Sequence, residues 1–182
     1  HAITADAPGA MARTCTNLGI PFLHISTDYV FAGTGQGAWP PDAAMGPQNA
    51  YGRSKLAGEA AVRAAGGQHA ILRTAWVFSA DGANFVTPML RLSEPRDALR
   101  LVGDHWGGPA PERGIAGPFR ARNVCPGRTG CHRDRDRHRR LSDARTRPLN
   151  SELDCTTLTR DFGITPPDWR DDLAQVIKEL LP

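Results

Sequence analysis

Two stretches of the sequence, LHISTDYVFAG at residues 23–33 and YGRSKLAGE at residues 51–59, decide the fold and hold the candidate chemistry. The first belongs to an apolar run, residues 21–26, that passes into the polar residues Ser-Thr-Asp, which is typical of a buried strand leading into a loop. The second lies in a segment with helical periodicity, residues 49–65. A strand followed by a helix in this way is the unit from which parallel sheets are built.

The segments around these two stretches continue the same alternation. Glycine and proline mark the boundaries, with Gly19 ending a first helix and the pair Gly66-Gly67 ending the second. Residues 32–49 are rich in Gly, Pro, Ala and Asn and predict a long loop. The chain is therefore expected to have an α/β fold with a parallel sheet: helices 4–18, 49–65 and 84–94, and strands 21–26 and 69–78.

Side-chain patterns within the predicted helices indicate which faces are buried. The first helix offers Thr4 or Asp6 as a cap, and Asp168 is the expected N-cap of a closing helix. In that closing helix the apolar side chains fall on one face. The buried stripes are expected to be Leu56, Ala60 and Val62 in helix 49–65, and Trp169, Leu173, Val176, Ile177 and Leu180 in the closing helix.

Length and composition suit one domain with a small appendage. The chain has 182 residues and no apolar run of about 18 residues, so no membrane span is expected. Its four cysteines form no dense disulfide pattern, which suits a reducing cytoplasm. The first residues lack both Met and the features of a secretory signal, so we expect the chain to begin inside a longer protein.

The positive charge is confined to one segment. Residues 113–147 hold 11 Arg against 3 acidic residues, whereas the rest of the chain holds 11 Lys or Arg against 16 acidic residues. A protein that coats nucleic acid is therefore not indicated. Disorder is the favoured interpretation of the Arg-rich tract, because it has almost no apolar periodicity. Two alternatives are RNA binding and a zinc site, although the spacing of Cys125, Cys131, His132 and His138 fits no common zinc finger.

The opening stretches also suggest a reaction. Tyr51 and Lys55 are four residues apart at the start of a helix, so they share one face, and an ammonium group near a phenol favours proton exchange. Thr27 lies where a strand meets its loop, which is where open α/β sheets bind ligands. A phenol, a hydroxyl and a cation suit a carbonyl that is reduced to an alcohol, with the hydride coming from a nicotinamide.

Taken alone, Tyr-x-x-x-Lys is a weak motif, and an exposed Tyr beside a solvated Lys explains it equally well. The chain has only two lysines, which makes a chance match less frequent. Five blocks in order are far more specific: STDYVF, YGRSKLAGE, LRTAWVF, NFV with MLRL, and RPLNSELDC. Over residues 3–104 and 147–181 they resemble the dTDP-4-dehydrorhamnose reductase family of extended short-chain dehydrogenase/reductases.

The resemblance implies a partial Rossmann-like parallel sheet with flanking helices and a small C-terminal substrate-side region. Residues 1–104 would be the C-terminal half of an NAD(P)-binding domain, and residues 147–182 a remnant of the substrate domain with a closing helix. Residues 105–146 would be a disrupted Arg-rich segment between them.

The resemblance also implies roles for single residues. Tyr51 would donate the proton, Thr27 would polarise the ketone and contact substrate, and Lys55 would bind the nicotinamide ribose and tune Tyr51. Tyr51 and Lys55 would thus both contact the cofactor, and Asp28 and Trp76 would contact the nucleotide sugar. For Trp76, a half-buried core aromatic is the alternative interpretation.

The implied activity is reduction of the C4 ketone of dTDP-4-dehydro-6-deoxy-L-mannose to dTDP-L-rhamnose, a cytoplasmic step of nucleotide-sugar biosynthesis. The cofactor would be NADPH or NADH, since the residues that select between them are not found in the sequence. No nucleic-acid or membrane partner is expected, and a homodimer is one option for the oligomeric state. Some relatives bind Mg²⁺ at a subunit interface, but no residue of this sequence can be assigned to it.

Two departures from the family pattern argue for reduced activity. The sequence contains no Gly-x-x-Gly-x-x-Gly turn for a cofactor pyrophosphate, and GTGQG at 33–37 opens no helix, so it predicts a flexible loop. The Arg-rich stretch 119–146 replaces a longer family segment. We therefore expect residues 1–182 to turn over poorly. The alternatives are a non-catalytic homologue, like the β subunit of methionine adenosyltransferase, and an inactive fragment, and the presence of Thr27, Tyr51 and Lys55 favours an enzyme over the former.

Overall fold

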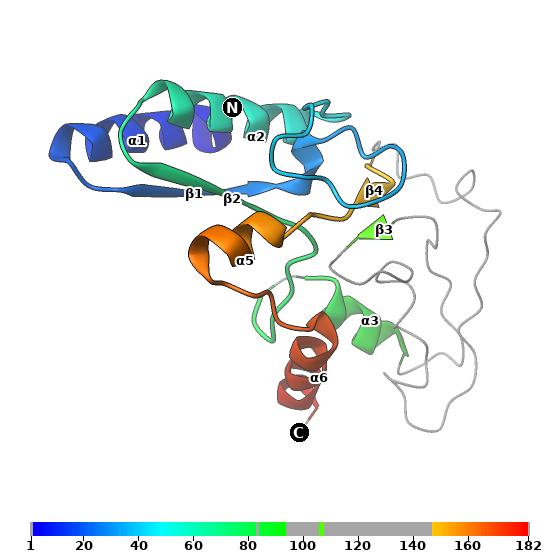
Figure 1. The fold of residues 1–182 in the computed structure, drawn as a ribbon. Coiled ribbons are helices and arrows are strands. Elements are labelled where there is room, and N and C mark those ends of the chain that lie inside the picture. Colours follow the sequence, from blue (N-terminus) through cyan, green and yellow to red (C-terminus); the bar gives the residue numbers. More distant parts are fainter. Residues whose placement is uncertain (1, 83, 94–105, 108–146, 182) are drawn as a thin grey trace. The chain divides into compact units, whose positions relative to one another are not determined.

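The computed structural model describes residues 2–82, 84–93, 106–107 and 147–181 (Figure 1). The described residues fall into two compact units. The first unit contains residues 2–75 and 147–151, and the second contains the described residues from 76 to 107 together with 152–181.

The first unit is a helix-strand-helix-strand arrangement. Its elements, in chain order, are the π-helical turn η1 (Ala2–Asp6), α1 (Ala7–Leu18), β1 (Phe22–Thr27), the 3-10 turn η2 (Asp28–Val30), α2 (Ala50–Ala64), β2 (His69–Thr74) and β4 (Asn150–Ser151).

Strands β1 and β2 are parallel and pair in register from Phe22 with His69 to Thr27 with Thr74. Helix α2 makes the crossover between them, so the three elements form a βαβ unit. Helices α1 and α2 lie side by side on one face of the strand pair (Figure 1). The predicted α/β class with a parallel sheet is confirmed.

Strand β1 is buried on one face. His24 and Ser26 are buried, whereas Leu23 and Ile25 are 61% and 48% exposed. Successive side chains of a strand point to opposite faces, and α1 and α2 cover only the face that carries His24 and Ser26. The prediction of a buried strand is therefore wrong for the face that carries Leu23 and Ile25, which no described element covers.

The helix ends follow the predicted signals in part. Gly19 closes α1 in the left-handed conformation, with φ of 68°, as expected. Asp6 stands at the start of α1 but makes no side-chain capping bond, because the chain is already helical in η1. Asn49 is the N-cap of α2, and its side chain accepts a hydrogen bond from the Gly52 amide.

The buried stripe of α2 differs from the prediction at one position. Val62 is fully buried and Leu56 is partly buried, but Ala60 is exposed. Gly58 and Glu59 are buried instead. A Cβ on Gly58 would lie 2.3 Å from the carbonyl oxygen of Thr4, so the small residue allows η1 to approach the helix closely.

The loop after η2 is tied to the segment around β4. The Asn150 amide donates to Gly33 O at 2.9 Å, its side-chain nitrogen donates to Gly37 O at 2.8 Å, and its carbonyl accepts from Trp39 Nε1 at 3.2 Å. Gly33 has φ of 67°, and a Cβ there would overlap Pro148. The predicted flexible loop is therefore held by hydrogen bonds from a distant part of the sequence.

The second unit contains α3 (Val86–Ser93), β3 (Trp106–Gly107), α5 (Thr156–Phe162) and α6 (Trp169–Leu180). Val86, Leu90 and Leu173 are its buried core. The Asp168 side chain caps α6 by accepting from the Arg170 amide, as predicted. The predicted apolar face of α6 is also confirmed, because all of its members belong to this core or pack against it: Trp169, Leu173, Val176, Ile177 and Leu180.

Strand β2 is shorter than predicted. It ends at Thr74, and two residues later Trp76 takes a left-handed conformation with φ of 55°, which is incompatible with a strand. The predicted disordered segment 105–146, with its zinc and RNA alternatives, lies outside the described residues apart from 106–107. Among the described helices, none has the length and apolar character that crossing a membrane requires.

Candidate active site

Thr27 is a buried residue at the carboxyl end of β1. Its backbone is still extended, and its hydroxyl accepts a hydrogen bond from the Tyr29 amide at 3.3 Å, which starts η2. The same hydroxyl donates to Asp28 Oδ1 at 2.9 Å. Thr27 therefore sits at the turn from strand to loop, where the sequence predicted it.

Asp28 is buried beside this hydroxyl. Burial raises the pKa of its carboxyl from 3.8 to about 6, although hydrogen bonds from Thr27 and from the backbone lower it in part. The pair thus combines a hydroxyl with a carboxyl that changes its charge close to neutral pH.

The first turn of α2 packs against η2. A Cβ on Gly52 would lie 2.2 Å from the carbonyl oxygen of Tyr29, so only glycine permits this approach. The ring of Tyr51 meets the ring of Tyr29 edge to face, with centroids 5.7 Å apart. Tyr51 is half exposed, as a side chain that must reach a ligand should be.

Lys55 lies one helical turn after Tyr51. Its Nζ donates a hydrogen bond of 2.7 Å to the carbonyl oxygen of Ile25 in β1. Tyr51 thus contacts the residue two positions after Thr27, and Lys55 contacts the residue two positions before it. The two elements that carry the predicted catalytic set, β1 and α2, are therefore in contact on both sides of Thr27.

The ammonium group of Lys55 also affects His24. This histidine is buried, and its Nε2 has no hydrogen-bond partner among the described residues. Burial lowers its pKa most, the charge of Lys55 lowers it further, and the charge of Glu59 opposes both. Sequence reasoning did not single out His24, because a histidine in an apolar strand carries no motif.

Trp76 belongs to the second unit. Its ring meets Phe85 edge to face, with centroids 6.5 Å apart, and it lines a small apolar pocket with Phe78, Trp169 and Leu173. Its left-handed backbone costs about 1–3 kcal/mol, and such strain gathers at ligand-binding positions.

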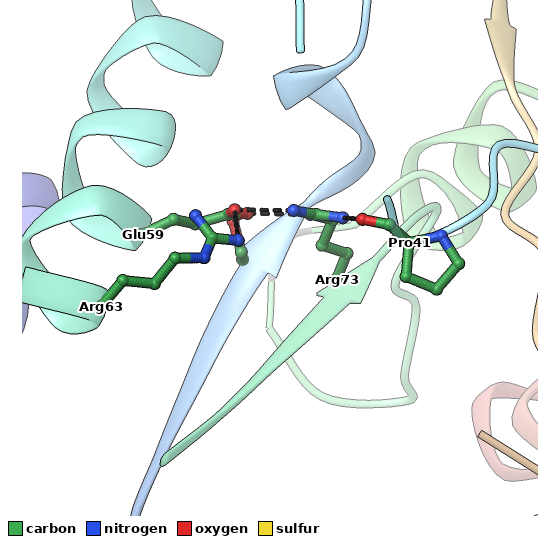
Figure 2. A network of polar contacts seen from close by, with 5 residues as sticks. Pro41, Glu59, Arg63 and Arg73 are labelled. Atoms are coloured by element: carbon green, nitrogen blue, oxygen red, sulfur yellow. Dashed lines mark hydrogen bonds and ion pairs between the residues drawn. The ribbon is translucent and has the colours of Figure 1, made fainter. Parts of the chain in front are cut away.

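A buried polar network was missed by sequence reasoning (Figure 2). Glu59 of α2 is fully buried and accepts hydrogen bonds from Ser26 Oγ at 2.6 Å, from Arg73 at 2.9 and 2.8 Å, and from Arg63 at 2.9 Å. Two features of the sequence could have indicated this network. Glu59 lies four residues after Lys55 and therefore on the same helical face, and Arg73 is a charged residue within an apolar strand.

A parallel βαβ unit whose first strand ends at Thr27 defines the class of fold: the chain is a Rossmann-like α/β protein. A family model described as the RmlD substrate binding domain matches residues 1–121. A dTDP-4-dehydrorhamnose reductase from Sinorhizobium fredii is 35% identical over 217 residues, covering 99% of this chain and 73% of the relative. The Burkholderia thailandensis reductase is 33% identical and covers 98% and 74%.

Solved structures agree with this assignment. A Clostridium acetobutylicum dTDP-4-dehydrorhamnose reductase superposes with a TM-score of 0.85 at 26% identity, covering 98% of this chain and 72% of that one. The Bacillus anthracis reductase, solved in complex with NADP, shares the fold with a TM-score of 0.82 at 24% identity, covering 97% and 72%. The chain therefore belongs to the dTDP-4-dehydrorhamnose reductase family.

This membership confirms the predicted family and the Rossmann-like fold class. The relatives named above are reductases, and they give no support to a non-catalytic binding subunit. The alignment with the Sinorhizobium fredii protein spans 217 positions although the chain has 182 residues, so that relative contains residues with no counterpart here.

Proposed function

We propose that the chain is an NAD(P)H-dependent reductase that converts the C4 ketone of dTDP-4-dehydro-6-deoxy-L-mannose to the alcohol of dTDP-L-rhamnose. The observation that supports this most is the arrangement around Thr27: Tyr51 lies against Tyr29, and Lys55 is bonded to Ile25. We infer that a hydroxyl, a phenol and an ammonium group face the ligand at this strand end, a set that suits a carbonyl that gains a hydride and a proton.

Each of the three side chains has a distinct task in this proposal. The Thr27 hydroxyl holds the ketone oxygen, and the Tyr51 hydroxyl gives its proton to that oxygen. Lys55 stabilises the phenolate that Tyr51 leaves behind. NAD(P)H, when bound, supplies the hydride to the C4 carbon.

The described residues fit one end of this cofactor. The ammonium group of Lys55 has three donors, and within the described part of the chain only one of them is used, in the bond to Ile25 O, which leaves two for ribose hydroxyls. The Gly-rich loop at 33–37 is not assigned to the pyrophosphate, because no helix begins directly after it and it therefore presents no helix N-terminus to an anion. We assign only the nicotinamide-ribose end, to Tyr51 and Lys55.

Asp28 and Trp76 are proposed to contact the nucleotide sugar. The buried Asp28 carboxyl adjoins Thr27, and the strained backbone of Trp76 supports a binding role over simple packing. We further propose that the enzyme works in the cytoplasm on a dTDP-sugar, without nucleic-acid or membrane partners, and that a homodimer is one option. A Mg²⁺ ion is assigned no residue.

The test is NAD(P)H oxidation, followed by absorbance, with dTDP-4-dehydro-6-deoxy-L-mannose. It uses residues 1–182 and, in parallel, a fusion protein that adds a Gly-rich strand-turn-helix of the kind that the family pattern implies. In the active form, Tyr51→Phe should lower kcat by about 100-fold or more, because it removes the proton donor. Tyr29→Phe is the matched control and should leave most of the rate, because it deletes a phenol hydroxyl that has no part in the proposed reaction.

Two results would contradict the proposal. One is a Tyr51→Phe variant that keeps more than about a tenth of the wild-type kcat. The other is an active protein that oxidises NAD(P)H with other keto sugars but leaves the dTDP-linked substrate unchanged.

A further inference from the structure

We propose that Glu59 and Arg73 are positioning residues, which fix the helix that carries Tyr51 and Lys55 against the strand that carries Thr27. This inference rests on the proposed function. It starts from the place of Glu59, which lies on α2 one turn after Lys55 and two turns after Tyr51.

Glu59 connects three elements at one point (Figure 2). From α2, its Oε1 accepts a 2.6 Å hydrogen bond from Ser26, the residue directly before Thr27 in β1. Both carboxylate oxygens also accept from Arg73 of β2, at 2.9 and 2.8 Å. The helix with the proposed acid is thereby joined to both strands through a single carboxylate.

The geometry of the Arg73 contact is restrictive. Its guanidinium places Nε on one oxygen of Glu59 and Nη2 on the other, which fixes the orientation as well as the distance. Both partners are enclosed, with side-chain exposures of 9% and 0%. A buried ion pair is weak evidence for stability, because the cost of desolvation offsets the attraction. The role that we assign to this pair is therefore to fix the orientation of α2 relative to β2.

The charge state of Glu59 agrees with this arrangement. Burial alone would raise the pKa of the carboxyl, but hydrogen bonds from Arg73 and Ser26, and the Arg73 charge, hold it below its usual value. Glu59 therefore stays an acceptor for all of its partners at neutral pH.

Arg73 extends the same connection to the loop. Its Nη1 donates to the carbonyl oxygen of Pro41 at 2.8 Å, and its guanidinium carbon lies 4.9 Å from the centre of the Phe31 ring. Phe31 in turn stacks on Trp39, with centroids 5.1 Å apart. One side chain thus holds the Glu59 carboxylate and the loop that follows η2.

Arg63 provides a matched control on the same carboxylate. It also bonds Glu59, at 2.9 Å, but it is 47% exposed and lies on the same helix, four residues later. The Arg63 contact joins α2 only to itself. Replacement of either arginine by lysine keeps the charge and removes the fork, yet only Arg73→Lys breaks a contact between elements.

The experiment compares Arg73→Lys with Arg63→Lys in the fusion protein, with the wild type and Tyr51→Phe alongside. Arg73→Lys should lower kcat by about tenfold or more, because a small displacement of Tyr51 from Thr27 disturbs the reacting geometry. The KM for the dTDP-sugar should change by less than about threefold, and Arg63→Lys should change neither value by more than about twofold. All variants are measured at a temperature well below their unfolding midpoints.

A second measurement does not depend on activity. The Tyr29 amide bonds the Thr27 hydroxyl, so its hydrogen exchange reports the placement of this strand end. Exchange at this amide should be about tenfold faster in Arg73→Lys, and unchanged at the amides of α6 in the second unit. In Arg63→Lys both should match the wild type.

The two arginine variants decide the inference. Equal kcat values and equal exchange at Tyr29 in Arg73→Lys and Arg63→Lys would overturn it, as would a loss of kcat matched by a KM increase of the same size. An active Tyr51→Phe variant would instead refute the proposed function. If no form of the protein is active, the exchange comparison alone decides the inference.

Discussion

Asp28→Asn replaces the buried carboxyl at the end of β1 by a group of the same shape that does not ionise. The pKa of this carboxyl is about 6 in the folded protein, against 3.8 for an unperturbed aspartate. Between these two values the folded state holds more protons than the unfolded chain. The contribution of Asp28 to stability is therefore favourable in acid, falls as the pH rises from about 4 to 6, and stays low above that range.

The size of the effect follows from the shift. The two values differ by about two units, and one unit corresponds to 1.36 kcal/mol, so ionisation of Asp28 costs the folded protein about 3 kcal/mol. Asn keeps an oxygen that accepts the Thr27 hydrogen bond and carries no ionisation cost. The variant should therefore gain about 3 kcal/mol of unfolding free energy relative to the wild type between pH 4 and pH 7.

The assay must report on the first unit alone. Fluorotryptophan labelling gives each of the four tryptophans its own NMR signal, and Trp39 belongs to the unit that contains Asp28. Urea unfolding is followed at the Trp39 signal at several pH values and gives the free energy of unfolding of the variant and of the wild type. The contributions of the other titrating groups cancel in the difference between the two free energies. The reasoning is refuted if this difference is independent of pH, or if the Asp28 carboxyl titrates near 4 in the folded protein.

Two further predictions test the packing around the candidate site. Gly52→Ala should destabilise the first unit by about 1–3 kcal/mol, because the new Cβ would lie 2.2 Å from Tyr29 O. Thermal unfolding measures this change. A gain of about 1 kcal/mol, which is typical of Gly→Ala in a solvent-exposed helix, would contradict the close contact. The pKa of His24 should lie below 6.5, so its burial costs stability as the pH falls through that value. Lys55→Met should raise the His24 midpoint in a histidine NMR titration, and an unchanged midpoint would place the ammonium away from this ring.

Local patterns in the sequence predicted the elements that carry the candidate site, and also the start of the closing helix α6. The apolar run before Thr27, the helical spacing of Tyr51 and Lys55, and the cap at Asp168 are all properties of a few neighbouring residues. Each depends on periodicity or on capping, which act over one or two turns.

The features that the sequence did not reveal depend on contacts between distant residues. Glu59 looks like an exposed helical residue until Arg73 and Ser26 are brought to it by the sheet. The raised pKa of Asp28 arises from burial, which no short pattern encodes. The early end of β2 depends on the unusual backbone of Trp76, a conformation that a bulky residue adopts only when its surroundings impose it.

The hydrogen bonds of Asn150 also set an order of events during synthesis. Its side-chain bond to Gly37 and its carbonyl bond from Trp39 span 113 and 111 residues of sequence. At about 5–20 residues per second, a ribosome needs roughly 6 to 23 seconds to make that stretch. The βαβ unit has all of its own residues long before then, whereas the loop beside the candidate site waits for a partner that has not been translated. A nascent chain released before Asn150 would carry the strands and the helix of the site without the contacts that close its loop.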